Sequence, residues 1–178
     1  DETTWYMDAD GDGYGNAALA QSACEKPAGY VSNATDVDDN NSTLSALWQG
    51  TPVTFTKANF ADWSLAQNQD MISNTVSLTR QNKQGLFNSL VEIANYDACD
   101  GDEPTGTEWA YGTTSNYANL QFEPLGDLIG CNFSNIVDGR DMVLHIINEG
   151  IYIDIRFISW TQGDSNGGGF SYIRSTKN

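Results

Sequence analysis

Three aspartates near the start of the chain, Asp8, Asp10 and Asp12, alternate with single small residues, and Gly13 follows them. Carboxylates spaced this closely repel one another, so a compact fold of this segment requires an ion between them. In an EF-hand-type loop, positions 1, 3 and 5 supply side-chain oxygens, position 6 is a turn-making glycine, and position 7 supplies a backbone carbonyl. Those positions correspond here to the three aspartates, Gly13 and the carbonyl of Tyr14. Dense hard oxygen ligands predict a site for Ca²⁺.

The loop alone is incomplete as a calcium site. Its twelfth position, where an EF-hand places a bidentate glutamate, falls on the apolar Leu19. A second source of carboxylate is needed, and the nearest one in the sequence comprises Asp36, Asp38 and Asp39. We therefore expect this second acidic segment to fold back onto the loop and close the site.

The charge of the chain is strongly acidic, with 24 Asp and Glu against 8 Lys and Arg and a formal net charge of −16. This balance argues against a nucleic acid or an anionic membrane as a partner, because both attract basic surfaces. No stretch approaches the roughly 20 apolar residues that a membrane-spanning helix needs. Only 18% of the residues are charged, and this small share, with many glycines and aromatic residues, is typical of secreted β-proteins. We expect any export signal to have been removed.

The acidic residues are concentrated at one end of the chain. Residues 1–50 hold nine acids against one base, Lys26, so half of the net charge lies in little more than a quarter of the sequence. From Thr51 onward, apolar and polar residues alternate. This change in residue pattern indicates a domain boundary near Asn41–Gly50. It predicts a calcium-binding module over residues 1–45 and a β-sandwich domain over residues 51–178.

The N-terminal segment resembles the bacterial MopE-type metal-binding repeat, which is akin to thrombospondin type 3 calcium repeats. The resemblance rests on Trp5 to Asn16, on Cys24, on Pro27 to Val31 and on Thr35 to Asn40. It implies a compact, calcium-organised module with little regular structure, completed by the second acidic cluster. The family usually has a bridging cysteine where this chain has Val37. Cys24 therefore lacks its expected partner and becomes a candidate for contact with another subunit.

The remainder of the chain reads as β-strands separated by turn signals. The clearest pair is 141–147 and 151–160, and in the second of these Ile151, Ile153, Ile155 and Phe157 share one face with a period of two. A helical turn is indicated only for 61–70. Seven or eight short strands predict an antiparallel two-sheet sandwich, most simply a jelly roll. The other expected strands are 52–57, 72–80, 86–94, 107–113, 119–122 and 170–176.

Several short segments of this larger part resemble a domain found in secreted proteins of diverse bacteria, for which no activity is established. The resemblance implies an extracellular β-domain and no particular chemistry. The segments are Asn68–Asp70, Thr79–Arg80, Gln84–Asn88, Thr107–Ala110, Asp141–His145, Ile151–Ile155 and Gly168–Tyr172.

The chain has three cysteines, and an odd number in a secreted protein implies one bridge and one remaining thiol. Cys99 and Cys131 both lie in polar, turn-rich surroundings, as cysteines that staple loops often do. We expect these two to form a disulfide. The alternative is that both are free thiols in a reducing compartment.

Few residues suggest catalysis. The lone histidine, His145, lies within an expected strand, and without a partner nucleophile it favours a hydrogen-bonded structural role. Glu92, Glu108 and Asp154 are far apart in the sequence, and a glycosidase would need two such acids in one cleft. Glu108 is equally well explained as a partner of Arg80 or Arg156 in a structural ion pair. The prediction is a protein that is not an enzyme.

Two functions remain, and they belong to different classes. One is a calcium-binding structural or adhesive surface protein that self-associates, as a filament subunit does, or binds cell-surface or matrix components. The other is a carbohydrate-binding module, for which five Trp and eight Tyr could supply flat surfaces for a polysaccharide. For Trp109, Phe157 and Trp160, however, core packing is the favoured interpretation.

Overall fold

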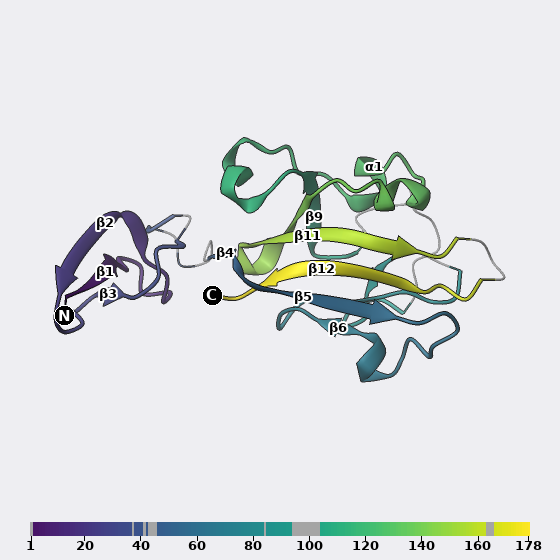
Figure 1. Cartoon of the computed structure of the whole chain (residues 1–178), viewed down its shortest axis with the longest axis horizontal. Helices are drawn as coiled ribbons and strands as arrows, with labels where there is room; N and C mark the ends of the chain where they lie inside the picture. Colours follow the sequence, from purple (N-terminus) through teal and green to yellow (C-terminus); the bar gives the residue numbers. More distant parts are fainter. Residues whose placement is uncertain are drawn as a thin grey trace.

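The computed structural model describes residues 2–36, 38–40, 42, 46–83, 85–93, 104–162 and 166–178. The protein is mainly β, as the sequence predicts, with antiparallel sheets and short helices. Figure 1 shows a small N-terminal part, built from the first three strands, that extends from a larger body. Among the described residues, no helix is both long and apolar enough to cross a membrane.

The N-terminal part contains a three-stranded antiparallel sheet, so the expectation of little regular structure is wrong there. Its strands are β1 (Thr3–Met7), β2 (Asn16–Ala23) and β3 (Tyr30–Val31), in the order β2-β1-β3. Almost all of β2 is exposed. A strand with both faces in water needs no alternation of apolar and polar residues, and residues 16–23 therefore show no period of two.

The body is organised around a six-stranded sheet. Its main path runs β5-β12-β11-β10-β9, and β4 pairs in parallel with β11. The four consecutive strands from β9 to β12 thus form an antiparallel meander, while the jelly-roll connection stays a prediction. The strands are β4 (Ala46–Trp48), β5 (Gly50–Lys57), β9 (Thr107–Tyr111), β10 (Met142–Ile146), β11 (Ile151–Trp160) and β12 (Phe170–Thr176).

The pair β10–β11 forms as predicted, with Leu144 opposite Ile153. The connection is the 3₁₀ turn η4 (Ile147–Glu149), closed by Gly150 at a φ of 59°. That left-handed conformation is readily available to glycine, which has no Cβ to clash with the backbone. The alternate residues Ile151, Ile153, Ile155 and Phe157 are all buried, which confirms the period of two.

A smaller sheet and several helical turns cover the inner face of the large sheet. The core between them includes Val76, Leu78 and Leu86 from the small-sheet side and Trp109, Leu144 and Phe157 from the large sheet. Trp160 is partly buried against it, so the core role predicted for these aromatics is confirmed. The elements are β6 (Asp70–Met71), β7 (Ser77–Thr79), β8 (Phe87–Asn88), η1 (Ala66–Asn68), α1 (Leu125–Leu128) and η3 (Phe133–Val137). The turn η2 (Thr114–Asn119) instead contacts Tyr152 and Asp154, which lie on the other face of β11.

Three strand predictions are too long or wrong. Only Ser77–Thr79 of segment 72–80 is a strand, because a turn precedes it in which Ile72 N–H and Ser73 N–H both donate to the carbonyl of Val76. Only Phe87–Asn88 of segment 86–94 is a strand, and Ala94 lies outside the described residues. Segment 119–122 forms no strand, and the chain pairs only afterwards, at the bridge between Glu123 and Trp109.

Candidate metal centre

The predicted loop folds around its own aspartates. Asp8 Oδ1 accepts a hydrogen bond from the N–H of Gly11 (2.8 Å), and Asp12 Oδ1 accepts one from the N–H of Tyr14 (2.8 Å). Gly11 and Gly13 have φ values of 81° and 92°, which lets the chain turn this tightly. As a result, one carboxylate oxygen from each of Asp8, Asp10 and Asp12 lies within 4.8 Å of the others.

The second acidic segment lies against this loop, as the sequence predicts. The N–H of Asp36 donates to the carbonyl of Gly15 (3.2 Å), and Asp39 Oδ1 accepts from the N–H of Ala9 (2.9 Å). Asp38 is exposed, and its Oδ1 accepts from the N–H of Asn40 (3.3 Å). The contacts with the loop therefore come from Asp36 and Asp39.

Asn33 fastens the two segments together, and sequence reasoning missed it. Its Nδ2 donates to the carbonyl of Gly13 (3.0 Å), and its Oδ1 accepts from the N–H of Gly15 (3.3 Å). A side-chain amide that both donates and accepts can satisfy two backbone groups of a turn at once. The only available signal was its place three residues before Asp36.

Three buried carboxylate oxygens of this site lack a hydrogen-bond donor in the described part of the chain. Oδ2 of Asp10, Oδ2 of Asp12 and Oδ2 of Asp36 are each buried and have no partner among the described residues. Burial, followed by the charges of Asp10, Asp8 and Asp39, raises the pKa of Asp12. Burial, together with the charges of Asp12 and Asp10, raises the pKa of Asp36 to about 6. The groups of the protein itself therefore compensate the negative charges of these carboxylates poorly.

The donor set fits a hard divalent cation. All candidate ligands are oxygens, and several carboxylates supply them, as in calcium sites with six to eight oxygen ligands. Tyr14 is buried, and its ring lies 5.1 Å from Lys177 Nζ. The predicted role of its carbonyl as a ligand stays a prediction.

The centre lies at the junction of the two parts of the protein. A cavity of about 650 Å³ is lined by Asp12 and Tyr14 from the N-terminal part and by Trp48, Glu149 and Lys177, among others, from the body. An ion at Asp12 would therefore act on the attachment of the N-terminal sheet as well as on its internal order.

The residues considered for catalysis are held in separate local contacts. Glu108 Oε2 lies 3.5 Å from His145 Nδ1, across the neighbouring strands β9 and β10. Its partner in the structure is therefore His145, whereas the sequence suggests Arg80 or Arg156 as partners. Asp154 accepts hydrogen bonds from the N–H and hydroxyl of Thr114 (2.6 and 2.8 Å). Glu92 accepts from Thr105 Oγ1 (2.7 Å).

Two of the three cysteines, Cys24 and Cys131, belong to the described residues. Cys24 has a free thiol and is exposed, at the residue after the end of β2. Cys99 lies outside the described residues, so its bridge to Cys131 stays a prediction.

Comparisons with models of protein families, with curated proteins and with solved structures gave no match to this chain. The likeness to MopE-type repeats therefore stays a prediction from residues 1–42.

Proposed function

We propose that this chain is a secreted, calcium-binding structural or adhesive surface protein, in which Ca²⁺ stabilises the N-terminal part and its junction with the body. The observation that carries the proposal is a set of three buried, unpartnered carboxylate oxygens, from Asp10, Asp12 and Asp36, in a loop and an acidic segment that hydrogen-bond to each other. Two of these acids come from the loop and the third from a segment some 24 residues later, so one ion would tie both segments together.

Thermal unfolding of the chelated protein during a calcium titration tests this role. An ion that binds only the folded state stabilises it by about 2.7 kcal/mol at a concentration 100-fold above its dissociation constant. The double variant Asp10→Asn, Asp12→Asn is expected to lose this stabilisation. In chelator, the same variant is expected to melt at or above the wild-type temperature, because the amides remove the repulsion between carboxylates.

Glu25→Gln is the matched control, because Glu25 is an exposed acid of the same part of the protein outside the cluster. It is expected to keep the full response to calcium. A wild-type melting temperature that is the same in calcium and in chelator contradicts the proposal.

Self-association is supported by the edge strand β2. Among the described residues it pairs on one side only, with β1, and its eight residues carry no charge; its register with β1 shifts between Asn16 and Ala20. Charges and prolines are two of the devices by which soluble proteins protect such edges, and β2 has neither; an open edge can add a strand from another chain. We propose that β2 joins neighbouring subunits in an assembly.

Electron microscopy and sedimentation velocity in the presence of calcium test the assembly. The double variant Ala18→Lys, Ala20→Lys places charges on β2 and is expected to abolish association. Gln67→Lys adds a charge at an exposed position of η1 and is expected to leave it intact. A wild-type protein that stays monomeric at high concentration contradicts this part of the proposal.

A further inference from the structure

A pocket of about 530 Å³ lies between the loop that follows β5 and the segment Gln81–Lys83. The loop contributes Phe60, Asp62 and Trp63 to its lining, and the second segment contributes Gln81, Asn82 and Lys83. Small-molecule pockets in proteins have volumes of ~300–1,000 Å³ and combine apolar walls with a few polar groups. The loop follows the end of β5 that points away from the N-terminal part, so the pocket is remote from the candidate metal centre (Figure 1).

The backbone at Phe60 is strained. Its φ is 61°, in the left-handed region, where a residue with a side chain is strained. The conformation is held by a hydrogen bond from Phe60 N–H to the carbonyl of Gly167 (2.7 Å) and by one from Gly169 N–H to Asn59 Oδ1 (2.8 Å). The strained geometry is therefore fixed by the segment before β12.

The loop after β5, the segment Gln81–Lys83 and the glycines before β12 pack closely against one another. A Cβ at Gly167 would lie 2.6 Å from Phe60 N and 2.7 Å from Phe60 Cδ2, and a Cβ at Gly168 would lie 2.0 Å from the carbonyl oxygen of Gln81. Only glycine allows the backbones to approach this closely. The walls of the pocket are thus preorganised, which lowers the entropic cost of binding a ligand.

The aromatic side chains of the pocket present apolar surface to solvent. Phe60 is 65% exposed, although it is a large hydrophobic residue in a strained conformation. Trp63 is half-buried, and its ring is fixed edge-on to the buried ring of Phe87 at a centroid distance of 5.4 Å. Within the described part of the chain, the indole N–H of Trp63 has no hydrogen-bond partner, so it remains available as a donor.

The polar side chains of the pocket offer both donors and acceptors. Asp62 Oδ1 accepts from Ser64 N–H (2.9 Å) and Ser64 Oγ (2.7 Å), and these bonds lower the pKa of Asp62. Its second oxygen remains available as an ionised acceptor. The amide of Asn82 and the ammonium of Lys83 form no hydrogen bond with any other described side chain or backbone group.

We propose that this pocket binds a neutral saccharide. Hydroxyl groups both donate and accept, so a polyol satisfies an acceptor-only carboxylate, a donor-only ammonium and an amide within one site. The opposite charges of Asp62 and Lys83 favour a ligand without net charge, and the formal charge of −16 disfavours an acidic one. The apolar face of a sugar ring can lie against the exposed ring of Phe60, which removes apolar surface of both from water.

Isothermal titration calorimetry on the full chain in calcium tests the proposal. The probes are neutral oligosaccharides of glucose, xylose, mannose and N-acetylglucosamine, with an oligogalacturonate as the acidic comparison. At least one neutral oligosaccharide is expected to bind saturably, and the oligogalacturonate more weakly. No saturable binding by any neutral probe, or tighter binding of the acidic one, overturns the proposal.

Phe60→Gly is the decisive variant, because glycine adopts the positive φ without strain and the fold is kept while the ring is lost. It is expected to weaken binding about tenfold or more, as truncation of a central aromatic contact does. Asp62→Asn removes the ionised acceptor at constant size and is expected to weaken binding as well. Ile158→Ala, at another exposed apolar position, on β11, is the control and is expected to bind as wild type. Unchanged affinity in Phe60→Gly rules out this pocket.

Discussion

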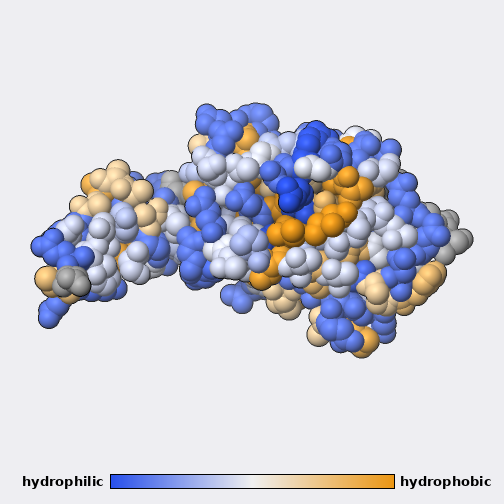
Figure 2. Space-filling model, in the orientation of Figure 1, coloured by the Kyte–Doolittle hydropathy of each residue, from blue (hydrophilic) through white to orange (hydrophobic). Residues whose placement is uncertain are grey.

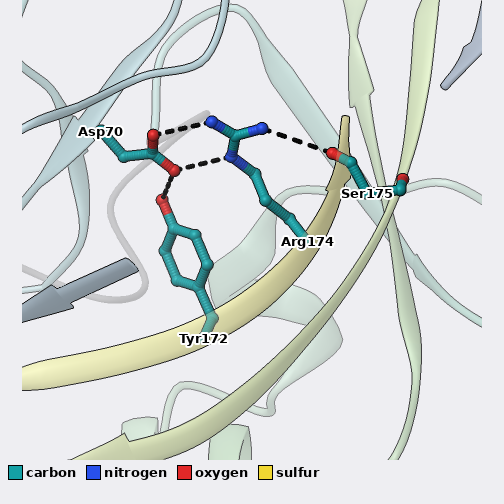
Figure 3. Close-up of polar contacts among 4 residues, drawn as sticks. All are labelled: Asp70, Tyr172, Arg174 and Ser175. Carbon is teal, nitrogen blue, oxygen red and sulfur yellow. Dashed lines mark hydrogen bonds and ion pairs between the residues drawn. The ribbon is translucent and has the colours of Figure 1, made fainter. Parts of the chain in front are cut away.

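Asp70 and Arg174 form a two-pronged ion pair inside the protein, with Asp70 Oδ2 2.7 Å from Arg174 Nε and Asp70 Oδ1 2.8 Å from Arg174 Nη2 (Figure 3). Asp70 begins β6 of the small sheet and Arg174 belongs to β12 of the large one, so the pair joins the two layers. Tyr172 donates a further hydrogen bond to Asp70 Oδ2 (2.7 Å). Burial, together with the Asp70 charge, raises the pKa of Tyr172.

Asp70→Asn is expected to destabilise the protein by about 3 kcal/mol, because it leaves the buried Arg174 guanidinium without a compensating charge. Urea unfolding at neutral pH measures the change. Asp138→Asn is the comparison, since Asp138 pairs with the half-exposed Arg140 at the surface, where ion pairs contribute about 0–1 kcal/mol. Equal midpoints for the two variants would contradict a stabilising role for the inner pair.

Gly15→Ala is expected to abolish the stabilisation by calcium that we propose. A Cβ there would lie 2.6 Å from Tyr6 Cβ and 2.7 Å from the carbonyl oxygen of Asn33. Because the carbonyl of Gly15 also accepts from Asp36 N–H, any shift of this residue moves the second acidic segment off the loop. Calorimetric calcium titration measures the loss. Ala18→Val, at an exposed position of β2, should bind calcium as wild type does.

Acid is expected to destabilise the body partly through His145. The ring lies between Glu108 on β9 and Tyr152 on β11, and burial lowers the pKa of His145 despite the nearby carboxylate. The unfolded chain therefore binds this proton more tightly, and stability is lost as pH falls through the unfolded value of about 6.5. The buried Nε2 of His145 also lacks a partner among the described residues.

Urea unfolding of wild type and His145→Gln between pH 5 and pH 8 isolates this contribution. Glutamine does not titrate, so the variant is expected to lose less free energy of unfolding than wild type on acidification through pH 6.5. Parallel curves for the two proteins would show that His145 does not contribute.

Thiol counting is expected to give one reactive group per chain. Cys24 is exposed and free, so it should react with Ellman's reagent in the native protein. If Cys99 and Cys131 are bridged, the count stays at one after denaturation without reductant, and Cys24→Ser lowers it to zero. A count of three in denaturant would show that the predicted disulfide is absent.

The alternation along 151–160 determined a buried strand face, and the signals around 148–150 determined the hairpin with β10. Both depend on residues close in sequence, where periodicity and turn chemistry act directly. The aspartates at 8, 10 and 12 likewise defined the candidate metal loop from spacing alone. The same local reasoning failed for β2, because an exposed edge strand leaves no hydrophobic pattern to detect.

Only the tertiary structure decided which distant groups meet. The N–H of Asp36 meets the carbonyl of Gly15 through the folding of β2 and β3, and Asp70 and Arg174 pair across 104 residues. The carbonyl of Gly167 accepts a hydrogen bond from Phe60 in the wall of the pocket. Such pairings depend on how the sheets stack and on where glycine permits close approach. The order of residues along the chain shows neither how the sheets stack nor which glycines lie at close contacts. The sequence therefore identified the central hairpin of the body and the candidate acidic ligands, while the three-dimensional packing determined which distant groups lie beside them.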